Sequence, residues 1–419
     1  MRPLADRFVT VFESPHPDTV YCFSPGIARS PSGRLIATLD LAGPGVERLP
    51  GRKAQPGRDA HAWQGKIFTS DDRGATWVHR ADFPFLHARP FTAGHALYVL
   101  GHYGDLMIVR SDDEGETWTQ PTRLTEAEQW HAAPCNVLHC NGCVYLVMEK
   151  RVSSDVHGWS VSELAPVLLR GRADRDLCRR ETWTFASELG FRSAVDAGSL
   201  RKIGVPFFRT PPDRSIAVAP GRGCAPIGWL EANVVQFVAP DHYWFDPAGR
   251  TFHLWLRAHT GGTGYAAICR VVEQDDGSMA TGLARVPSGK TVVYVPCPGG
   301  QMKFHILYDE QTALYWLLSS QATDSMTRAD RLPEERYNLP NNERHRLQLH
   351  FSRNCMDWVF AGLVAAGPAP KQSRNYASMV IDGDDLHVLS RSGDARAASA
   401  HNGNLITFHT VRDFRSLVY

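Results

Sequence analysis

The 419-residue chain lacks long apolar runs and an excess of charge of either sign. No stretch approaches the roughly 20 apolar residues that a membrane helix needs, so we expect no membrane span. Lysine and arginine total 45 against 44 aspartate and glutamate, a net charge of +1. A balance this even argues against a protein built to bind nucleic acid, which normally carries a basic surface.

A secretory signal is also missing from the N-terminal segment. Charges at Arg2, Asp6 and Arg7 interrupt it, and no apolar core or small-residue cleavage site follows. We therefore expect a cytoplasmic protein, with the proviso that a signal already removed would leave no trace in the chain.

Cysteines are few, odd in number and scattered: nine in all. Cys140 and Cys143 form a C-x-x-C pair around Asn141-Gly142, a favoured turn sequence. A zinc site would need a second pair of cysteines or histidines nearby, and none is present in the sequence. We interpret the pair as two thiols flanking a β-turn and expect no metal and no other cofactor. Unpaired thiols favour a reducing compartment.

Helical periodicity is nearly absent, and residues 161–170 and 181–190 are the exceptions, where we expect a short helix or an inserted excursion. Elsewhere, short apolar segments rich in β-branched and aromatic residues alternate with Gly, Asn and Asp turns, which predicts an all-β fold. These segments are 35–39, 96–100, 106–109, 144–148, 291–295, 314–318, 386–389 and 405–408.

An internal repeat follows some of these strands. The segment from Ser70 to Trp77 recurs 41 residues later from Ser111 to Trp118, a shortened copy spans 352–358, and a remnant lies at 181–183. In such a turn an aspartate bonds to backbone amides, a glycine supplies a positive φ and the tryptophan packs back as an apolar anchor. We therefore expect each copy to stabilise a hairpin rather than to take part in catalysis.

This pattern, Ser-x-Asp-x-Gly-x-Thr-Trp, resembles the Asp-box of the sialidase superfamily. The resemblance implies a single β-propeller domain over residues 1–419, with six or seven four-stranded antiparallel blades and Asp-box hairpins. Blades of about 50 to 60 residues would accommodate the chain, and we favour seven.

True sialidases resemble one another in an Arg-Ile-Pro motif near the first blade, an arginine triad for the substrate carboxylate and a Tyr/Glu nucleophile pair. Here the matching region, residues 21–28, lacks the arginine. Because a bidentate arginine holds a planar carboxylate, this departure argues against ordinary sialidase chemistry.

From about residue 95 onward the chain is instead similar to the propellers of ulvan lyases and of enzymes acting on rhamnosyl-glucuronate linkages. The similarity rests on an ordered set of short segments: 101–104, 130–134, 298–309, 381–386 and 401–409. It implies cleavage of a uronate-containing glycan by β-elimination, and therefore an acidic oligo- or polysaccharide as the partner.

β-Elimination needs a cation to neutralise the uronate carboxylate, a base to take the C5 proton and an acid for the leaving oxygen. The resemblance assigns the base and acid to His102 and His131, since histidine transfers protons near neutral pH. Arg257 is our choice for the cation and Tyr265 for an auxiliary donor. Each residue also has a structural alternative. His102 would be a surface-turn histidine and His131 a hydrogen-bonded structural histidine. Arg257 would be a salt-bridged blade residue and Tyr265 a core tyrosine.

Five further residues are candidates for binding the substrate: Glu231, Lys303, Arg374, His401 and Asn402. Glu231 lies in an apolar run, so it is either a functional carboxylate or the partner of a neighbouring arginine.

Two other functions stay open. One is an exo-glycosidase of sialidase or rhamnosidase type, which would use two carboxylates, or a tyrosine and a carboxylate, facing one sugar. Its candidate carboxylates are Asp105, Glu149, Glu231 and Asp324. The other is a glycan-binding propeller without catalysis. We also expect residues 43–64 to form a mobile loop and residues 327–346 to form a surface excursion between blades, without a function.

Overall fold

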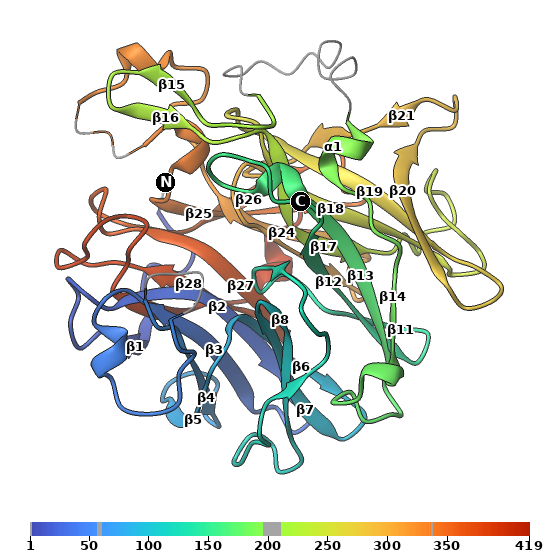
Figure 1. Cartoon of the computed structure of the whole chain (residues 1–419), viewed down its shortest axis with the longest axis horizontal. Coiled ribbons are helices and arrows are strands. Elements are labelled where there is room, and N and C mark those ends of the chain that lie inside the picture. The colour runs from blue at the N-terminus through green and yellow to red at the C-terminus, as the bar shows by residue number, and fades with distance from the viewer. Residues whose placement is uncertain (1, 57–60, 196–210, 335, 337) are drawn as a thin grey trace.

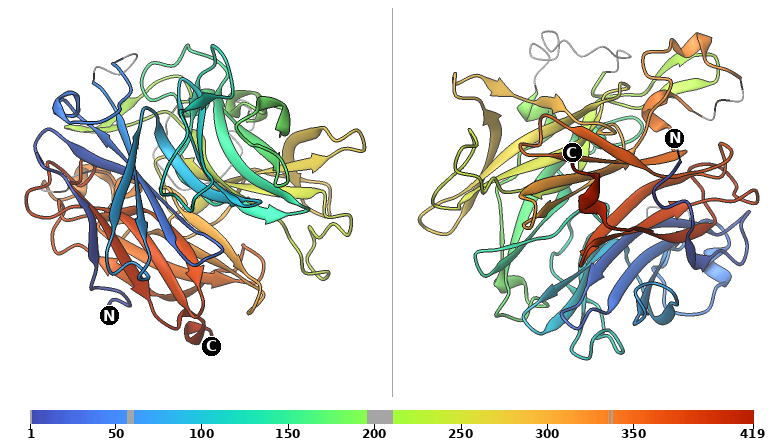
Figure 2. Two further views of the ribbon diagram at one scale, coloured as in Figure 1. Left: turned by 90° about the horizontal axis from the view of Figure 1, so that it is seen from below. Right: turned by 180° about the vertical axis from the view of Figure 1, so that it is seen from behind.

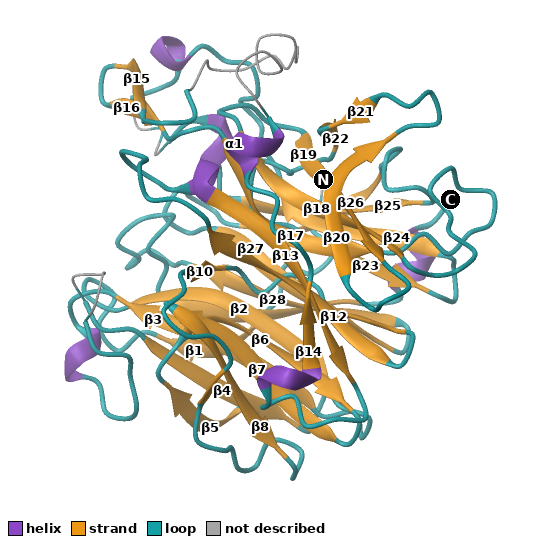
Figure 3. Cartoon of the chain, turned by 45° about the vertical axis from the view of Figure 1, so that its right-hand side comes forward, coloured by secondary structure: helices purple, strands orange, loops and turns teal. Residues whose placement is uncertain are grey.

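The computed structural model describes residues 2–56, 61–195, 211–334, 336 and 338–419, and strands dominate these residues (Figure 3). They form a six-bladed β-propeller of mostly four-stranded antiparallel sheets. The all-β propeller is therefore confirmed, whereas our preference for seven blades is wrong. That preference rested on blades of about 50 to 60 residues, but long segments inside blades 1 and 5, residues 43–63 and 321–345, take up part of the chain length that a seventh blade would need.

The first three blades follow one another along the chain. Blade 1 consists of β2 (Tyr21–Arg29), β3 (Leu35–Ala42), β4 (Gln64–Ser70) and β5 (Val78–Phe83). Blade 2 consists of β6 (Leu86–Ala93), β7 (Ala96–Tyr103), β8 (Asp105–Ser111) and β9 (Thr122–Arg123). Blade 3 consists of β10 (Trp130–His131), β11 (Leu138–Cys140), β12 (Cys143–Arg151), β13 (Leu164–Arg172) and β14 (Trp183–Phe185), and its innermost strand is interrupted between β10 and β11.

The last three blades complete the ring. Blade 4 consists of β17 (Gly228–Val235), β18 (Thr251–His259), β19 (Tyr265–Glu273), β20 (Met279–Arg285), β21 (Thr291–Val292) and β22 (Tyr294–Pro296). Blade 5 consists of β23 (His305–Asp309), β24 (Leu314–Ser320), β25 (Arg346–Ser352) and β26 (Val359–Ala366). Blade 6 consists of β27 (Arg374–Asp382), β28 (Asp385–Ser392), β29 (Leu405–Val411) and β1 (Val9–Glu13).

The two ends of the chain close the ring within blade 6. Strand β1 pairs antiparallel with β29, with Val9 opposite Phe408 and Glu13 opposite Leu405. The blue N-terminal strands accordingly lie beside the red C-terminal ones in all views (Figures 1 and 2). Six buried apolar clusters each join one blade to the next around the ring. Hydrophobic burial between blades therefore holds the propeller together.

Helices are confined to single turns in the described part of the chain: α1 (Phe191–Ala194), η1 (Val46–Arg48), η2 (Val161–Glu163), η3 (Arg180–Thr182), η4 (Ala329–Arg331), η5 (Pro340–Asn342) and η6 (Phe414–Leu417). A helix over residues 161–170 is not formed, because most of that segment belongs to β13. Its run of apolar residues reflects a strand buried on both faces, which periodicity cannot separate from a buried helix. Among the described residues, none of these turns has the length and apolar character of a membrane-crossing helix.

The excursion at 327–346 lies within blade 5, between β24 and β25, and not between two blades as we expected. It packs against a hairpin formed by β15 (Ile216–Ala219) and β16 (Arg222–Cys224). The guanidinium of Arg222 donates to the carbonyls of Ala329, Leu332 and Pro333. The two excursions therefore support each other.

The Asp-boxes form the hairpins between the third and fourth strands of blades 1, 2 and 5. In the first copy, Asp72 accepts hydrogen bonds from the Thr76 amide at 2.8 Å and the Thr76 hydroxyl at 2.6 Å. Gly74 has a φ of +87°, and the ring of Phe408 from blade 6 occupies the space that a Cβ would need. The predicted structural role is confirmed, and the hairpin also packs on the neighbouring blade.

The C-x-x-C pair forms the expected turn. Cys140 and Cys143 are opposite each other in the β11–β12 hairpin, and Asn141 and Gly142 between them have φ values of +52° and +67°. Both thiols are free.

Candidate functional site

Four innermost strands carry a β-bulge near their first residues. In each bulge a residue other than glycine has a positive φ: Ser24 in β2, His87 in β6, Glu231 in β17 and Tyr376 in β27. Such backbone conformations are costly for side chains with a Cβ, and they concentrate at functional sites. The bulges therefore mark one end of the propeller axis as the candidate site.

Side chains from these bulges meet side chains from the ends of the neighbouring second strands. Arg257 lies opposite Leu230, His102 opposite Leu86, Glu149 opposite His131, and Arg391 opposite Asn375. We call this group the axial cluster, and it comprises His87, His102, His131, Glu149, Glu231, Arg257, Arg344, Tyr376 and Arg391.

Tyr376 is at the centre of the cationic half of the axial cluster. Its hydroxyl lies 2.5 Å from Oε1 of Glu231 and 2.8 Å from Nη1 of Arg257. Arg257 also contacts Oε2 of Glu231 at 3.2 Å, and both charged side chains are nearly fully buried. Burial raises the pKa of Tyr376 to about 12, so the phenol is protonated at neutral pH and donates to the Glu231 carboxylate.

Two more guanidinium groups flank the ring of Tyr376. Arg344 and Arg391 each lie 5.3 Å from the ring centroid. Arg344 also donates to Asn375 at 3.1 Å. Three guanidiniums thus converge on one tyrosine whose carboxylate partner is Glu231, an arrangement that favours an anionic ligand.

Arg391 also approaches the place in blade 1 where the sequence lacks an arginine. Its guanidinium lies 3.9 Å from the ring centroid of Phe23, and it donates to the carbonyl of His401. A guanidinium from the second strand of blade 6 therefore lies beside the part of blade 1 that lacks an arginine.

The other half of the axial cluster holds three histidines. His87 Nδ1 and His102 Nε2 are 3.1 Å apart, and the ring of His131 lies 5.5 Å from His87 and 6.1 Å from His102. Burial lowers the pKa of His102 to about 3 and holds the pKa of His87 well below its ordinary range. Both are therefore neutral near neutral pH, and one donates to the other.

Glu149 connects the histidines to the Tyr376 side of the site. Its Oε2 lies 3.5 Å from Nδ1 of His131, and its Oε1 accepts from the backbone amide of Ala232 at 3.0 Å. Ala232 follows Glu231 in the β17 bulge, so one fully buried carboxylate contacts both halves of the cluster.

Aromatic side chains border the cluster. Trp159 lies beside Arg257, whose guanidinium is 5.1 Å from its ring centroid, and the tryptophan is more than a third exposed. Trp63 belongs to the segment that we expected to be a mobile loop. Its ring centroid lies 5.7 Å from that of Phe23 and 6.1 Å from that of His87. Residues 57–60 of that segment lie outside the described residues, but Trp63 places the end of the loop against the site.

The structure brings together His102, His131, Arg257 and Glu231, which the sequence analysis selected. It also places His401 against Phe23, with ring centroids 5.3 Å apart, and the Nδ1–H of His401 donates to Oδ1 of Asn402 at 2.7 Å. Glu231 is paired with Arg257, and it also accepts a hydrogen bond from the Tyr376 hydroxyl.

Three other selected residues are placed differently. Lys303 is buried and donates to the Ala377 carbonyl and to Ser378 Oγ, and burial lowers its pKa to about 8. Arg374 donates to the carbonyls of Gln372, Ser373 and Gly393, which are local backbone groups. Tyr265 begins β19, the third strand from the axis in blade 4.

Two of the four candidate carboxylates, Glu149 and Glu231, belong to the axial cluster. Asp105 accepts from the Thr125 hydroxyl and the Glu128 amide, and so closes a turn in blade 2. Asp324 pairs with Arg336 at 2.7 Å in the blade 5 excursion.

The sequence analysis missed His87, Arg344, Tyr376 and Arg391. The sequence did contain one signal for Arg391. It is a charged residue near the end of an apolar second strand, as are Asp40, Glu149 and Arg257 in three other blades. Arg344 lies in the excursion to which we assigned no function. His87 and Tyr376 depend on bulges that leave no mark in the residue pattern.

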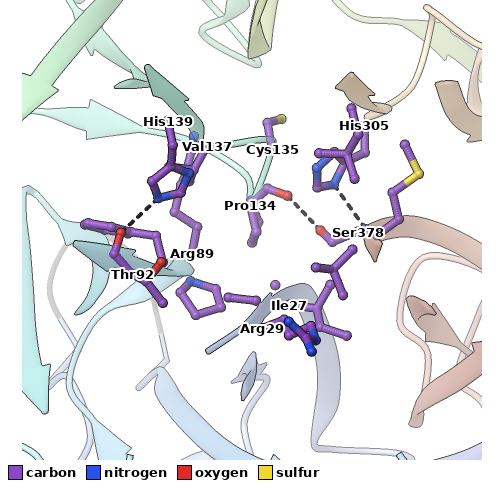
Figure 4. Close-up of a pocket in the computed structure, with 17 residues that line it drawn as sticks. Ile27, Arg29, Arg89, Thr92, Pro134, Cys135, Val137, His139, His305 and Ser378 are labelled. Atoms are coloured by element: carbon purple, nitrogen blue, oxygen red, sulfur yellow. Dashed lines mark hydrogen bonds between the residues drawn. The ribbon is translucent and has the colours of Figure 1, made fainter. Parts of the chain in front are cut away.

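A separate cavity of about 170 Å³ lies further along the axis, beyond the bulges (Figure 4). It is lined by the later residues of the innermost strands, including Ile27, Arg29, Thr92, His305 and Val380. In Figure 4, His139 bonds to the carbonyl of Thr92 on one side of this cavity. None of the axial cluster residues lines it.

Solved sialidase structures share this fold. A Hadza microbial sialidase matches with a TM-score of 0.53 and 13% identity, over 97% of this chain and 68% of that one. A Trypanosoma rangeli sialidase mutant displaying trans-sialidase activity matches with a TM-score of 0.52 and 12% identity, over 100% of this chain and 60% of that one. The Ruminococcus gnavus intramolecular trans-sialidase matches with a TM-score of 0.50 and 11% identity, over 96% of both chains.

These likenesses show a sialidase-like six-bladed propeller and, at 11–13% identity, no specific chemistry. No protein-family model and no curated protein matches the sequence.

Proposed function

We propose that this protein is a glycosidase of the sialidase type that hydrolyses the glycosidic bond of an acidic sugar. The observation that carries the proposal is the Tyr376 hydroxyl, which lies between the Glu231 carboxylate and the Arg257 guanidinium. A tyrosine paired with a carboxylate is one of the known solutions for attack at an anomeric carbon.

In this mechanism Tyr376 is the nucleophile and Glu231 is its base. The Tyr376 oxygen bonds to the anomeric carbon while its proton passes to Glu231. Arg257, Arg344 and Arg391 hold the carboxylate of the sugar beside the tyrosine, since guanidinium forks bind carboxylates in two-point contacts. The same positive charges stabilise phenolate character as the proton leaves.

β-Elimination, the reaction implied by the similarity to ulvan lyases, has weaker support. It would use His102 as a base, but burial lowers the pKa of His102 to about 3, which makes the ring a weak proton acceptor. His102 is also bonded to His87 and is almost fully buried.

The two reactions give different products. The protein would be incubated with 4-nitrophenyl glycosides of N-acetylneuraminic acid and glucuronic acid and with uronate-containing oligosaccharides. Hydrolysis adds one water to the total product mass, whereas elimination conserves the mass and creates an unsaturated sugar that absorbs in the near ultraviolet. We expect a mass gain of water. An unsaturated product would establish the lyase reaction, and binding without either product would leave a glycan-binding propeller.

Replacing the nucleophile tests the assignment of Tyr376. We expect Tyr376→Phe to lower kcat/KM by at least about a thousand-fold, because the attacking oxygen is removed while the ring remains. Tyr243→Phe is the matched control, since Tyr243 is 87% exposed. Retention of wild-type activity in Tyr376→Phe would refute the assignment.

A further inference from the structure

His131 is a histidine of the axial cluster whose side chain is partly exposed. About a quarter of its side chain is exposed, whereas His102 is 6% exposed. Its Nδ1 is enclosed and faces Glu149 Oε2, and neither atom has a hydrogen-bond partner in the described part of the chain. Unlike Nδ1, the Nε2 atom of His131 is not fully buried, and it has no hydrogen bond to the described residues.

A carboxylate behind one ring nitrogen orients an imidazole and stabilises its protonated form. Glu149 is in that position relative to His131, and it is itself fixed by the Ala232 amide at 3.0 Å. The neighbouring histidines, His87 and His102, are held neutral by burial and so place no fixed charge against an imidazolium. The ring nitrogen that is left open is then able to give or accept a proton.

The position of this pair relative to Tyr376 follows from the β17 bulge. Glu149 contacts Ala232, the residue after Glu231, and Glu231 contacts the Tyr376 hydroxyl at 2.5 Å. A sugar held by the guanidiniums around Tyr376 therefore has the histidine side of the axial cluster next to it. That side is where a leaving group or a second sugar would be located.

We propose that His131, oriented by Glu149, is the general acid and base of this glycosidase. The inference rests on the proposed function and extends it by naming the group that serves the leaving oxygen. Glu149 acts through His131 and is a positioning residue.

The proton and electron balance of the two steps is complete with these groups. In the first step the Tyr376 oxygen bonds to the anomeric carbon, its proton moves to Glu231, and the glycosidic C–O bond breaks as protonated His131 gives its Nε2 proton to the leaving oxygen. In the second step neutral His131 takes a proton from water, and that water oxygen bonds to the anomeric carbon. The bond to Tyr376 breaks, and Glu231 returns the proton to the phenolate.

Dependence on the leaving group separates this role from a structural one. A 4-nitrophenol leaving group needs little protonation, whereas methanol needs a general acid, which is worth about a hundred-fold or more in rate. The measurement is kcat/KM for the 4-nitrophenyl and methyl glycosides of N-acetylneuraminic acid and of glucuronic acid. We expect His131→Ala to lose at least a hundred-fold on the methyl glycoside and less than ten-fold on the 4-nitrophenyl glycoside of the sugar that the wild type cleaves.

Two further variants make the result specific. His95→Ala removes an exposed histidine in the β6–β7 turn and should leave both substrates unaffected. Glu149→Gln keeps an acceptor for the Ala232 amide and removes the charge behind His131. We expect it to lower activity mainly on the methyl glycoside, because the imidazole of His131 loses the carboxylate that orients it.

The outcomes distinguish the two proposals. Equal losses on both glycosides in His131→Ala, or no loss on either, would overturn the role of His131 and leave the glycosidase intact. A wild type that cleaves neither sugar would overturn the glycosidase proposal and the role of His131 with it. Circular dichroism of each variant verifies that the ring of blades is folded.

Discussion

Single residues show how strongly burial controls ionisation in this propeller. His253, outside the axial cluster, stacks on Trp244 with ring centroids 4.6 Å apart, and neither of its ring nitrogens has a hydrogen-bond partner among the described residues. Burial lowers its pKa from 6.5 to about 3. His253 is therefore protonated below about pH 6.5 in the unfolded chain but only below about pH 3 in the folded chain. Stability falls as the pH is lowered through this window.

We predict that His253→Phe raises stability by about 1 kcal/mol at pH 7 and weakens the loss of stability between pH 7 and pH 5. The substitution keeps an aromatic ring and removes two buried polar atoms without partners. Urea unfolding at both pH values would measure the change. His95→Phe, at an exposed site, should leave the pH dependence as it is. An unchanged slope in His253→Phe would contradict the prediction.

The hairpin is the element that the repeated sequence specifies. In the second Asp-box, Asp113 accepts from the Thr117 amide at 2.9 Å and from the Thr117 hydroxyl, and the Ser111 hydroxyl accepts from the Gly115 amide at 2.8 Å. The two bonds from Thr117, that of its hydroxyl first, lower the pKa of Asp113 to about 2. The carboxylate therefore stays ionised, and supports the turn, down to strongly acidic pH.

We predict that Asp113→Ala destabilises the protein by about 1 kcal/mol, as loss of a comparable capping bond does. Asp112→Ala in the same hairpin is the control, because Asp112 is 64% exposed and pairs only at the surface with Arg110. We expect the control to change the free energy of unfolding by less than about 0.5 kcal/mol. Chemical denaturation measures both, and equal effects of the two substitutions would show that the hairpin does not depend on the Asp113 bonds.

At the scale of the whole molecule, the ring depends on its closure through blade 6. The outer strand of this blade, β1, comes from the start of the chain and the other three come from its end. Val11 of β1 is 7% exposed and belongs to the apolar cluster that joins blades 6 and 1, whereas its neighbour Thr10 points outward and is exposed.

We predict that Val11→Asp lowers stability by more than about 3 kcal/mol, because it buries an unpaired charge at the closure. Thr10→Asp, one residue away in the same strand, should cost less than about 1 kcal/mol. Thermal unfolding of the two variants would test this. A melting temperature of Val11→Asp equal to that of the wild type would mean that β1 contributes little to closing the ring.

Most of the architecture could be predicted from local sequence. The Asp-box fixes hairpins through bonds between residues at most four positions apart, and apolar segments with turn residues fix strands, so the all-β class followed directly. The propeller followed from the resemblance of the repeated hairpins to the Asp-box of the sialidase superfamily. The number of blades did not follow, because it depends on where long insertions such as 321–345 fall relative to the sheets. The helix expected at 161–170 failed for a related reason, since burial on both faces of β13 removes the alternation that identifies a strand.

The sequence by itself determined the type of fold, its repeated hairpins and several polar residues at strand ends, among them His102, His131 and Arg257. Only the tertiary structure decided which of these residues meet. Tyr376 and Glu231 are 145 positions apart and come together because the bulges of two inner strands, in blades 4 and 6, bring their side chains into contact. A contact of this kind is set by the packing of whole blades, and no local pattern of residues encodes it.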